Sequence, residues 1–201
     1  MHRMIRPLAI GLAVVGLAAG SVTAGSGKLY TATLTQLNAG PHVVRGVTYA
    51  TIAPVSGHAN IRVVGDVVTV EISVNGATQS VHPQHIHAGP TCPTMSADVN
   101  NDTYVDVLEG IPAYGPILVN LDSNLNDMAA NTFPSGSSYM YSETALKSHL
   151  QDELDLALKL GSRHVVIHGI DTALPASVDT LPGLSNTVTL PVACGEMDLV
   201  R

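Results

Sequence analysis

The chain has 201 residues and a formal net charge of −7, and charged side chains make up only 12% of it. An acidic chain without a basic patch is not expected to bind nucleic acid, and anionic lipid would repel it. The length suits one domain, or one domain with a large insertion. Abundant glycine, proline, serine, threonine and valine favour a turn-rich β protein over a helical one.

The first residues have the pattern of an export signal. Two arginines precede an apolar run from Leu8 to Gly20, and small residues lead to a cleavage position at Ala24. Such a run is too short to cross a bilayer comfortably, so we interpret residues 1–24 as a signal peptide and residues 25–201 as the mature domain. An uncleaved N-terminal anchor is the alternative. The mature chain is expected to have no membrane segment and to be secreted or periplasmic.

The first half of the domain contains four β-forming runs, each closed by turn residues. They lie at residues 28–37, 43–52, 60–64 and 68–74. In the last run, valine and isoleucine alternate with polar residues, as in a strand with one buried face. The dipeptide at residues 75–76, Asn-Gly, then gives a hairpin signal. Short strands at this spacing are typical of an all-β sandwich or barrel.

The second half of the domain is less regular. We expect a loop at residues 92–116, a short strand at 117–121, and further strands at 163–168 and 187–193. Leucines recur at helical spacing between residues 142 and 160, and a glycine follows, which predicts one helix there. Its expected role is packing over a sheet edge or a barrel end.

A histidine cluster from His82 to His87 is the main candidate for chemistry. In a strand, side chains two residues apart share a face, so His85 and His87 would project together while Ile86 enters the core. Two imidazoles on one face form half of a site for copper or zinc. On its own this pair is weak evidence, because surface and structural histidine pairs are common.

The surroundings of this cluster resemble the copper loop of copper-zinc superoxide dismutases. The segment His-Pro-Gln-His-Ile-His at residues 82–87, followed shortly by Cys92, is similar to the family's run of copper-ligand histidines and its first disulfide cysteine. Residues 163–169, Arg-His-Val-Val-Ile-His-Gly, resemble the late strand that carries a further copper ligand. Residues 192–195, Val-Ala-Cys-Gly, resemble the segment of the second cysteine. The likeness fails across residues 93–162, which we interpret as an insertion.

The resemblance implies a fold and a ligand set. The fold would be a Greek-key β-sandwich or barrel with an inserted loop and one helix. His82 would be structural. The copper ligands would be His85, His87 and His168.

The two cysteines of the chain are Cys92 and Cys194. An oxidising compartment allows them to pair, and closing a loop of about a hundred residues would stabilise the fold by roughly 4–5 kcal/mol in the chain-entropy model. From the residues alone, two buried thiols are the alternative. The resemblance to the dismutases implies the disulfide.

Three departures from the dismutase pattern bear on activity. Residues 93–101 contain no counterpart of the bridging histidine, the zinc-ligand histidines are missing, and Pro191 stands where the family places the arginine that guides superoxide. Zinc is therefore not expected. Without the arginine, an anionic substrate loses both attraction and docking hydrogen bonds. The resemblance implies superoxide dismutation, but a copper-binding domain without turnover fits these departures equally well.

A second metal-type pattern lies in the inserted region. Counted from Asp98, oxygen-bearing side chains stand at positions 1, 3, 5, 9 and 12 of a 12-residue loop, with a backbone carbonyl for position 7. This is the ligand pattern of EF-hand and dockerin-like calcium loops. Thr103 stands where such loops have glycine, which makes the turn harder. The alternatives are a solvated acidic loop and a glycosylation site at residues 101–103. The candidate calcium ligands are Asp98, Asn100, Asp102, Tyr104, Asp106 and Glu109.

The sequence thus leaves two functions open. The first is an exported superoxide dismutase-like metalloprotein that binds copper. The second is a non-enzymatic extracellular domain on the same fold, stabilised by calcium and a disulfide, with a structural or adhesive role. The three histidines favour the first function, whereas the missing arginine and bridging histidine favour the second.

Overall fold

The computed structural model describes residues 27–127, 129–154 and 160–200. The predicted signal peptide at residues 1–24 lies outside this part of the chain, as do residues 155–159 of the predicted helix. None of the described helices has the length and apolar character needed to span a membrane.

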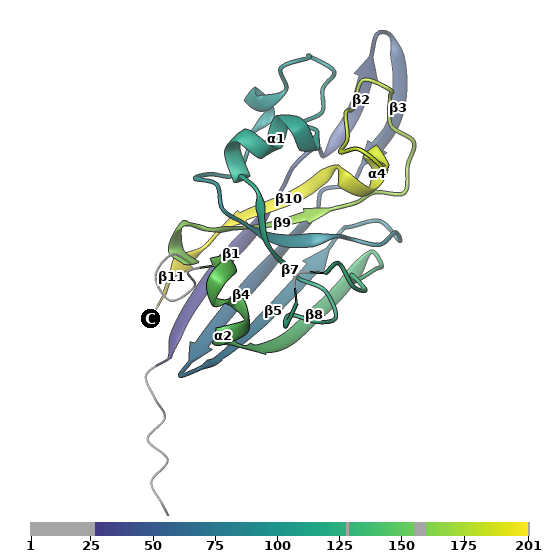
Figure 1. Ribbon diagram of the computed structural model, residues 1–201. Coiled ribbons are helices and arrows are strands. Elements are labelled where there is room, and N and C mark those ends of the chain that lie inside the picture. The colour runs from purple at the N-terminus through teal and green to yellow at the C-terminus, as the bar shows by residue number, and fades with distance from the viewer. Residues whose placement is uncertain (1–26, 128, 155–159, 201) are drawn as a thin grey trace, which may run out of the picture.

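The largest feature of the described chain is one curled antiparallel sheet (Figure 1). Its strands are hydrogen-bonded in the order β7-β6-β9-β10-β1-β4-β5-β8, and β11 pairs with β1. This curled antiparallel sheet confirms the expected fold class, an all-β sandwich or barrel. The strands of the sheet are β1 (Lys28–Gln36), β4 (Ser56–Val64), β5 (Val67–Asn75), β6 (Gln84–His87), β7 (Ile117–Asn120), β8 (Ser138–Leu146), β9 (His164–His168), β10 (Pro191–Glu196) and β11 (Asp198–Leu199).

The remaining elements lie outside the main sheet. The strands β2 (Gly40–Val44) and β3 (Val47–Ile52) form a separate two-stranded ribbon that projects from it (Figure 1). Single 3-10 turns lie at Met95–Ala97 and Leu160–Ser162. The helices are α1 (Val107–Tyr114), α2 (Lys147–Leu154) and α4 (Asn186–Thr189).

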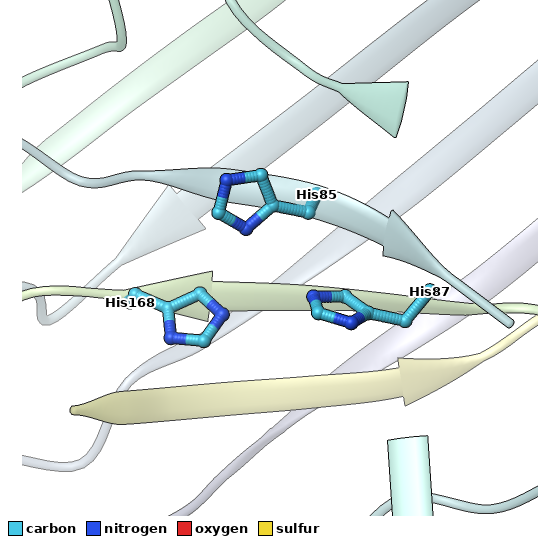
Figure 2. Close-up of side chains that lie close together, drawn as sticks. All are labelled: His85, His87 and His168. Atoms are coloured by element: carbon cyan, nitrogen blue, oxygen red, sulfur yellow. The ribbon is translucent and has the colours of Figure 1, made fainter. Parts of the chain in front are cut away.

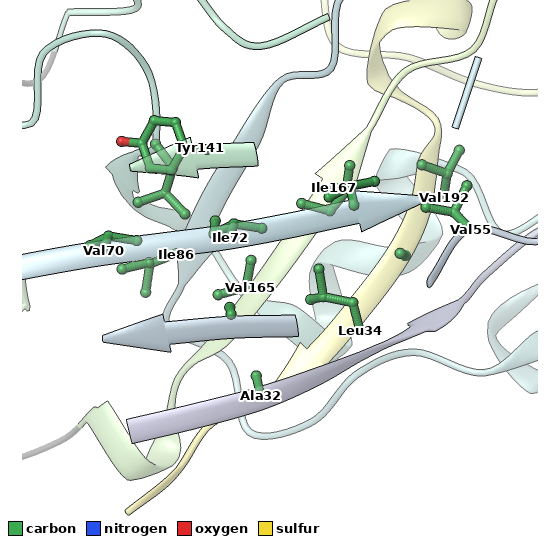
Figure 3. Close-up of a cluster of buried hydrophobic side chains, with 14 of the residues drawn as sticks. Ala32, Leu34, Val55, Val70, Ile72, Ile86, Tyr141, Val165, Ile167 and Val192 are labelled. Atoms are coloured by element: carbon green, nitrogen blue, oxygen red, sulfur yellow. The ribbon is translucent and has the colours of Figure 1, made fainter. Parts of the chain in front are cut away.

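The two halves of the curled sheet enclose one hydrophobic core (Figure 3). Ile72 of β5 lies in one half, Ile86 of β6 and Ile167 of β9 lie in the other, and each is at most 1% exposed. Burying a side chain of this size stabilises a fold by about 1.5–3 kcal/mol. Because Ile86 lies between His85 and His87 in the strand, the core decides which way these two histidines face.

The alternating run at residues 68–74 forms β5, as predicted. It pairs with β4 through a hairpin whose turn is Gly65-Asp66. The apolar positions of the run, which are Val68, Val70, Ile72 and Val74, are each 1% exposed. The period-2 pattern therefore identified both the strand and its buried face.

Two expectations for the N-terminal half are wrong in detail. Residues 43–52 are not one strand, because Arg45 and Gly46 have φ angles of 51° and 80° and reverse the chain between β2 and β3. Two successive residues with positive φ form the tight turn that suits a hairpin. The Asn-Gly dipeptide at residues 75–76 is not the turn of a hairpin, because the next strand in the chain, β6, does not pair with β5. The partners of β5 are β4 and β8.

The predicted helix at residues 142–160 is only partly confirmed. Its first five residues belong to β8, which pairs with β5 over nine positions. Tyr141 and Ala145 of β8 are buried against the core. The edge of β5 offers this segment a full ladder of hydrogen bonds, so sheet pairing overrides the helical pattern. Helix α2 begins at Lys147 and buries Leu150.

The stretch at residues 92–116, expected to be loop, contains helix α1. Asp106 caps this helix by accepting hydrogen bonds from the amides of Leu108 at 2.8 Å and Glu109 at 3.0 Å. The Glu109 carboxylate accepts one from the Asp106 amide at 3.2 Å, which completes a capping box. Pro112 lies inside the helix, and because proline disfavours helix interiors, the sequence did not predict a helix here.

The stretch at residues 187–193, expected to be one strand, begins as helix. Ser185 caps the single turn of α4 by accepting a hydrogen bond from the amide of Val188 at 3.3 Å. Strand β10 starts only at Pro191. This turn places the backbone carbonyl of Thr189 beside His168, whose Nδ1 donates a hydrogen bond to it at 2.7 Å.

Candidate metal centre

Strand β6 places two histidines on one face of the sheet. It lies between β7 and β9. His85 and His87 project from it on the same side (Figure 2), and Ile86 between them belongs to the core cluster. Their ring centroids are 5.6 Å apart. The arrangement expected from the His-x-His spacing is therefore confirmed.

Strand β9 supplies the third histidine. It runs antiparallel to β6, with His85 opposite Val166 and His87 opposite His164. Opposed residues of an antiparallel pair share a face, and so do residues two apart in a strand, which puts His168 on this face as well. Its ring centroid lies 5.2 Å from that of His85 and 5.9 Å from that of His87.

The three histidines form a group that can hold a metal ion. One ring nitrogen from each lies within 4.8 Å of the other two, and all three side chains are buried. Nitrogens that bind one ion at about 2.0–2.1 Å are at most about 4.2 Å apart. A small adjustment of the side chains therefore brings all three within bonding distance of one ion. Across the described residues, no other set of three histidine, cysteine or acidic side chains meets this distance criterion.

Backbone carbonyls orient two of the rings. Nδ1 of His87 donates to the Gly115 carbonyl at 2.8 Å, and Nδ1 of His168 donates to the Thr189 carbonyl at 2.7 Å. These bonds leave the lone pair on Nε2 of each ring. Nδ1 of His85 and Nε2 of His87 and His168 are buried and have no hydrogen-bond partner. Buried nitrogens without partners are rare in proteins, and ligation of a metal ion would satisfy them.

Burial keeps the three imidazoles neutral. It lowers the pKa of His87 from 6.5 to about 3, with a further lowering from His168. Burial likewise lowers the pKa of His168 to about 4. The pKa of His85 falls well below 6.5 through burial and, to a lesser extent, through the other two rings. A neutral imidazole is the form that binds a metal, so at neutral pH the site is ready without releasing protons.

Two neighbouring histidines lie outside the group. The ring of His82 is buried, with Nδ1 3.1 Å from the His168 carbonyl and Nε2 3.0 Å from the Thr78 carbonyl. It holds the backbone of β9 next to a candidate ligand. His164 lies at the far end of β9, where its Nε2 is 3.8 Å from a Glu196 carboxylate oxygen.

Two aromatic residues at the site were not predicted from the sequence. Tyr114, at the end of α1, has its ring centroid 4.7 Å from that of His87 and donates its hydroxyl to the Val107 carbonyl at 3.1 Å. Phe133 meets His85 edge-on with a centroid distance of 5.5 Å. Phe133 is the only phenylalanine of the chain and stands in a polar, proline-punctuated stretch, which is the one signal that could have found it.

The three histidines line a cavity of about 570 Å³. Its walls come from segments far apart in the sequence, including α1, the chain around Phe133 and the chain that leads into α4. The lining is almost entirely apolar, and no lysine, arginine, aspartate or glutamate of the described chain belongs to it. The candidate metal centre therefore opens into an uncharged pocket and not into a charged channel.

The predicted disulfide between Cys92 and Cys194 forms, with the two Cα atoms 5.8 Å apart. Cys194 lies in β10 opposite Val166 of β9, on a surface of the sheet that Tyr114 covers. Cys92 precedes α1 in the sequence. The bond therefore fastens the segment that carries α1 to the sheet beside the histidine-bearing strand.

In the first half of the predicted calcium loop, side-chain oxygens accept hydrogen bonds from the loop's own backbone amides. Asp98 accepts hydrogen bonds from the amides of Asp102 at 3.2 Å and Thr103 at 2.9 Å, and Asn100 accepts one from Asp102 at 2.9 Å. Asp102 accepts from the Tyr104 amide at 3.0 Å through Oδ1, whereas its Oδ2 is buried without a partner. Thr103 has a φ of 72°, the strained turn that its place in the loop led us to expect.

The second half of this loop is the start of α1. Asp106 is the cap residue, and Glu109 accepts hydrogen bonds from the amides of Val99 at 2.9 Å and Asn100 at 3.2 Å. Burial raises the pKa of Glu109, and the neighbouring Asp106 adds to this effect, while the amides that it binds oppose it. No three carboxylates of the described residues come as close together as the histidine nitrogens do. The predicted residues of the loop therefore lie together, but their carboxylate oxygens are farther apart than the ring nitrogens of the histidine group.

Pro191 lies opposite His168 in the pairing of β9 with β10. This is the position at which the dismutase resemblance would have an arginine, and it is occupied by a buried apolar ring. Arg163, which precedes β9 at the opposite end of the strand from His168, donates to the Ala88 carbonyl at 3.3 Å and does not line the cavity.

Comparison with known proteins adds no further identification. No family model matches the chain, and a search of curated proteins finds no significant match. The case for function therefore rests on the histidine group, its surroundings and the motifs of the sequence.

Proposed function

We propose that this chain is an exported, superoxide dismutase-like metalloprotein that binds one copper ion through His85, His87 and His168. The observation that carries the proposal is the convergence of three buried, neutral imidazoles from two strands. The order of motifs along the chain supports the same ligand set. The Greek-key arrangement of the dismutases is part of this proposal.

The donor set favours copper. Imidazole nitrogens suit copper and zinc, whereas calcium, magnesium and manganese prefer oxygen ligands. For a given set of nitrogen ligands, divalent copper binds more tightly than zinc. The group offers three nitrogens and no carboxylate, and carbonyl groups hold two of the rings in place. A copper ion bound there would supply one-electron redox chemistry, while the chain's own residues orient the ligands and exclude bulk water.

Superoxide dismutation is the activity that the resemblance implies, and two observations predict that it is slow. The cavity above the histidines has no cationic lining residue among those described. The chain as a whole is acidic, with a formal net charge of −7. An anionic substrate would therefore enter without electrostatic guidance.

Metal analysis of untagged protein, loaded with a mixture of copper and zinc and then desalted, tests the metal site. We expect one copper per chain, with nitrogen hyperfine splitting in the electron paramagnetic resonance spectrum of the cupric form. His85→Ala and His168→Ala should abolish tight binding. His58→Ala is the matched control, because His58 is exposed on β4, and it should retain the copper. Zinc in place of copper, or copper retained by both site variants, would refute the proposal.

Calcium binding by the loop from Asp98 to Glu109 is a second candidate function. The specific observation in its favour is Asp102, which is 3% exposed and has one carboxylate oxygen without a partner. A buried carboxylate oxygen of this kind is costly unless a cation or donor satisfies it. We propose that calcium stabilises the inserted region in this way, in the manner of a structural site.

Thermal unfolding with and without calcium tests the second candidate. At a calcium concentration of about 100 times the Kd, we expect a gain of about 2.7 kcal/mol from mass action. Asp102→Asn keeps the shape of the side chain and should remove most of this gain, whereas Asp198→Asn, at an exposed position of β11, should keep it. Equal stability of the native protein in calcium and in a chelator would contradict the site.

Export is the remaining part of the proposal. The disulfide fits an oxidising compartment. The N-terminal pattern predicts cleavage after Ala24. N-terminal sequencing of the protein recovered from its native host should start at Gly25, and an intact N-terminus on reduced protein from the cytosol would contradict it.

A further inference from the structure

The cavity above the three histidines has the size of a ligand pocket. Its volume is about 570 Å³, within the range of about 300–1,000 Å³ that small-molecule sites occupy. One wall is formed by α1, through Val107, Ile111 and Tyr114. The chain that leads into α4 and the chain around Phe133 form further walls.

Exposed apolar side chains gather around this cavity. Val81, Ile117, Leu184 and Val188 all line it, and their exposed fractions are 52%, 42%, 52% and 40%. Single exposed apolar residues are ordinary, but a cluster at one cavity marks a binding surface for an apolar partner. These side chains come from three separate segments, since Leu184 and Val188 both belong to the stretch that leads into and forms α4, so the fold and not the local sequence brings the segments together.

The polar side chains of the cavity lining are few, namely the three histidines, Tyr114, Asn120 and Thr189. The nitrogens without hydrogen-bond partners are those of the histidine group. The Tyr114 hydroxyl already donates to the Val107 carbonyl, and the Thr189 hydroxyl is 3.2 Å from the Ser185 carbonyl, to which it donates. The histidine nitrogens without partners are therefore the groups of the pocket that can bind a metal, and the rest of the lining is almost entirely apolar.

Charge in a ligand would be penalised in this pocket. No charged side chain of the described residues lines it, so an ionic ligand would lose water without gaining a partner along the walls. The acidic character of the chain adds repulsion for anions. Neutral, apolar molecules are the class that the walls accept.

We propose that this cavity binds a neutral, largely apolar small molecule that carries one metal-coordinating group, with the apolar body against the walls and the coordinating group directed at the ion on His85, His87 and His168. The proposal names a ligand class for the proposed copper site and rests on that site for the coordinating end. The apolar walls are independent of the metal. The two parts can therefore be tested separately.

The first experiment uses metal-free protein and a matched pair of fluorescent probes. N-phenyl-1-naphthylamine is neutral, and 8-anilinonaphthalene-1-sulfonate has a similar body with a negative charge. We expect the neutral probe to bind at least tenfold more tightly than the sulfonate. Leu184→Asp should weaken binding of the neutral probe at least tenfold, whereas Leu199→Asp, at a similarly exposed position of β11 (54%), should leave it unchanged.

The second experiment uses copper-loaded protein and two neutral ligands with the same coordinating ring. We expect 4-phenylimidazole to bind at least tenfold more tightly than imidazole, as followed by the change in the copper absorption band. The phenyl advantage should disappear in Leu184→Asp and persist in Leu199→Asp.

The outcomes distinguish this inference from the copper proposal. Copper binding with no phenyl advantage, or with tighter binding of the sulfonate probe, would overturn the apolar-ligand inference and leave the copper site intact. Failure to bind copper, with tight and Leu184-dependent binding of the neutral probe, would overturn the copper site and support the apolar cavity. Equal effects of the two aspartate variants would overturn the assignment of the probe to this cavity.

Discussion

Lowering the pH from 7 to 5 should destabilise the metal-free protein by several kcal/mol through its buried histidines. Burial holds the pKa of His87 at about 3 and that of His168 at about 4 in the folded state, and that of His85 well below 6.5. In the unfolded chain each ring titrates near 6.5. Between these values the unfolded state binds more protons than the folded state, so stability falls as the pH falls.

The size of this effect follows from proton linkage. A histidine with a pKa of about 6.5 when unfolded and about 3–4 when folded loses roughly 2 kcal/mol of stabilisation between pH 7 and pH 5. His87 and His168 together would lose about 4 kcal/mol, and His85, whose pKa is also lowered, adds to this loss. The total is a large part of the 5–15 kcal/mol typical of a folded domain. The contribution is fully present above about pH 6.5 and continues to be lost down to the folded-state pKa values. Most carboxylates stay ionised at pH 5, which limits their contribution.

Urea denaturation of chelator-treated protein at several pH values between 5 and 7.5 measures this loss. His87→Gln should reduce the slope by about one proton, or ~1.4 kcal/mol per pH unit, whereas His58→Gln at the exposed position on β4 should leave the slope unchanged. A total loss below about 2 kcal/mol between pH 7 and pH 5 would refute the reasoning, because linkage predicts that much for a single buried histidine.

Three further predictions follow from the fold and the cavity. Replacement of Cys92 and Cys194 by alanine should cost about 4–5 kcal/mol in urea unfolding, since the disulfide closes a loop with a sequence separation of 102 residues, and an unchanged midpoint would show that the bond contributes nothing. Gly89→Ala would place a Cβ 2.2 Å from the Ala113 carbonyl oxygen and should cost about 1–3 kcal/mol or more, whereas Gly161→Ala, whose nearest neighbour is 3.9 Å away, should be close to neutral; similar unfolding midpoints for the two variants would disprove the close contact. Any superoxide dismutation by the copper-loaded protein should not slow as salt rises from about 10 to about 200 mM, and a steep fall would reveal cationic guidance that the cavity lining does not provide.

The histidine-bearing strands could be predicted from the sequence because their patterns are local. The His-x-His spacing fixes a shared face for His85 and His87 wherever the segment is a strand, and the core position of Ile86 decides which face. His168 is different. No local pattern links it to the other two, and only the resemblance to a known family suggested it before the pairing of β6 with β9 brought it close.

Two kinds of element were not predicted. Some form because of pairing with residues far away in the sequence, and others have a sequence pattern that fits two different structures. The helical spacing of leucines predicted a helix over residues 142–160, yet its first five residues pair with the edge of β5 and join the sheet. Asp106 and Glu109 satisfy the calcium-loop pattern and the capping-box pattern at once, and the structure shows the capping box that begins α1. The cavity could not be predicted at all, because its walls come from segments that no short-range pattern connects.

Helix α1 joins the two candidate ion sites by a single rigid element. Its eight residues, from Val107 to Tyr114, span roughly 12 Å. Asp106 of the acidic loop caps its start, and the Gly115 carbonyl just beyond its end accepts a hydrogen bond from His87. An ion in the loop that shifted the start of α1 would therefore act on the carbonyl that orients His87. By thermodynamic reciprocity, an ion in the loop that changes the affinity for an ion on the histidines must have its own affinity changed by the same factor. With the two proposed ions in place, such coupling would make the metal affinity of the histidine group depend on the calcium level of the surroundings.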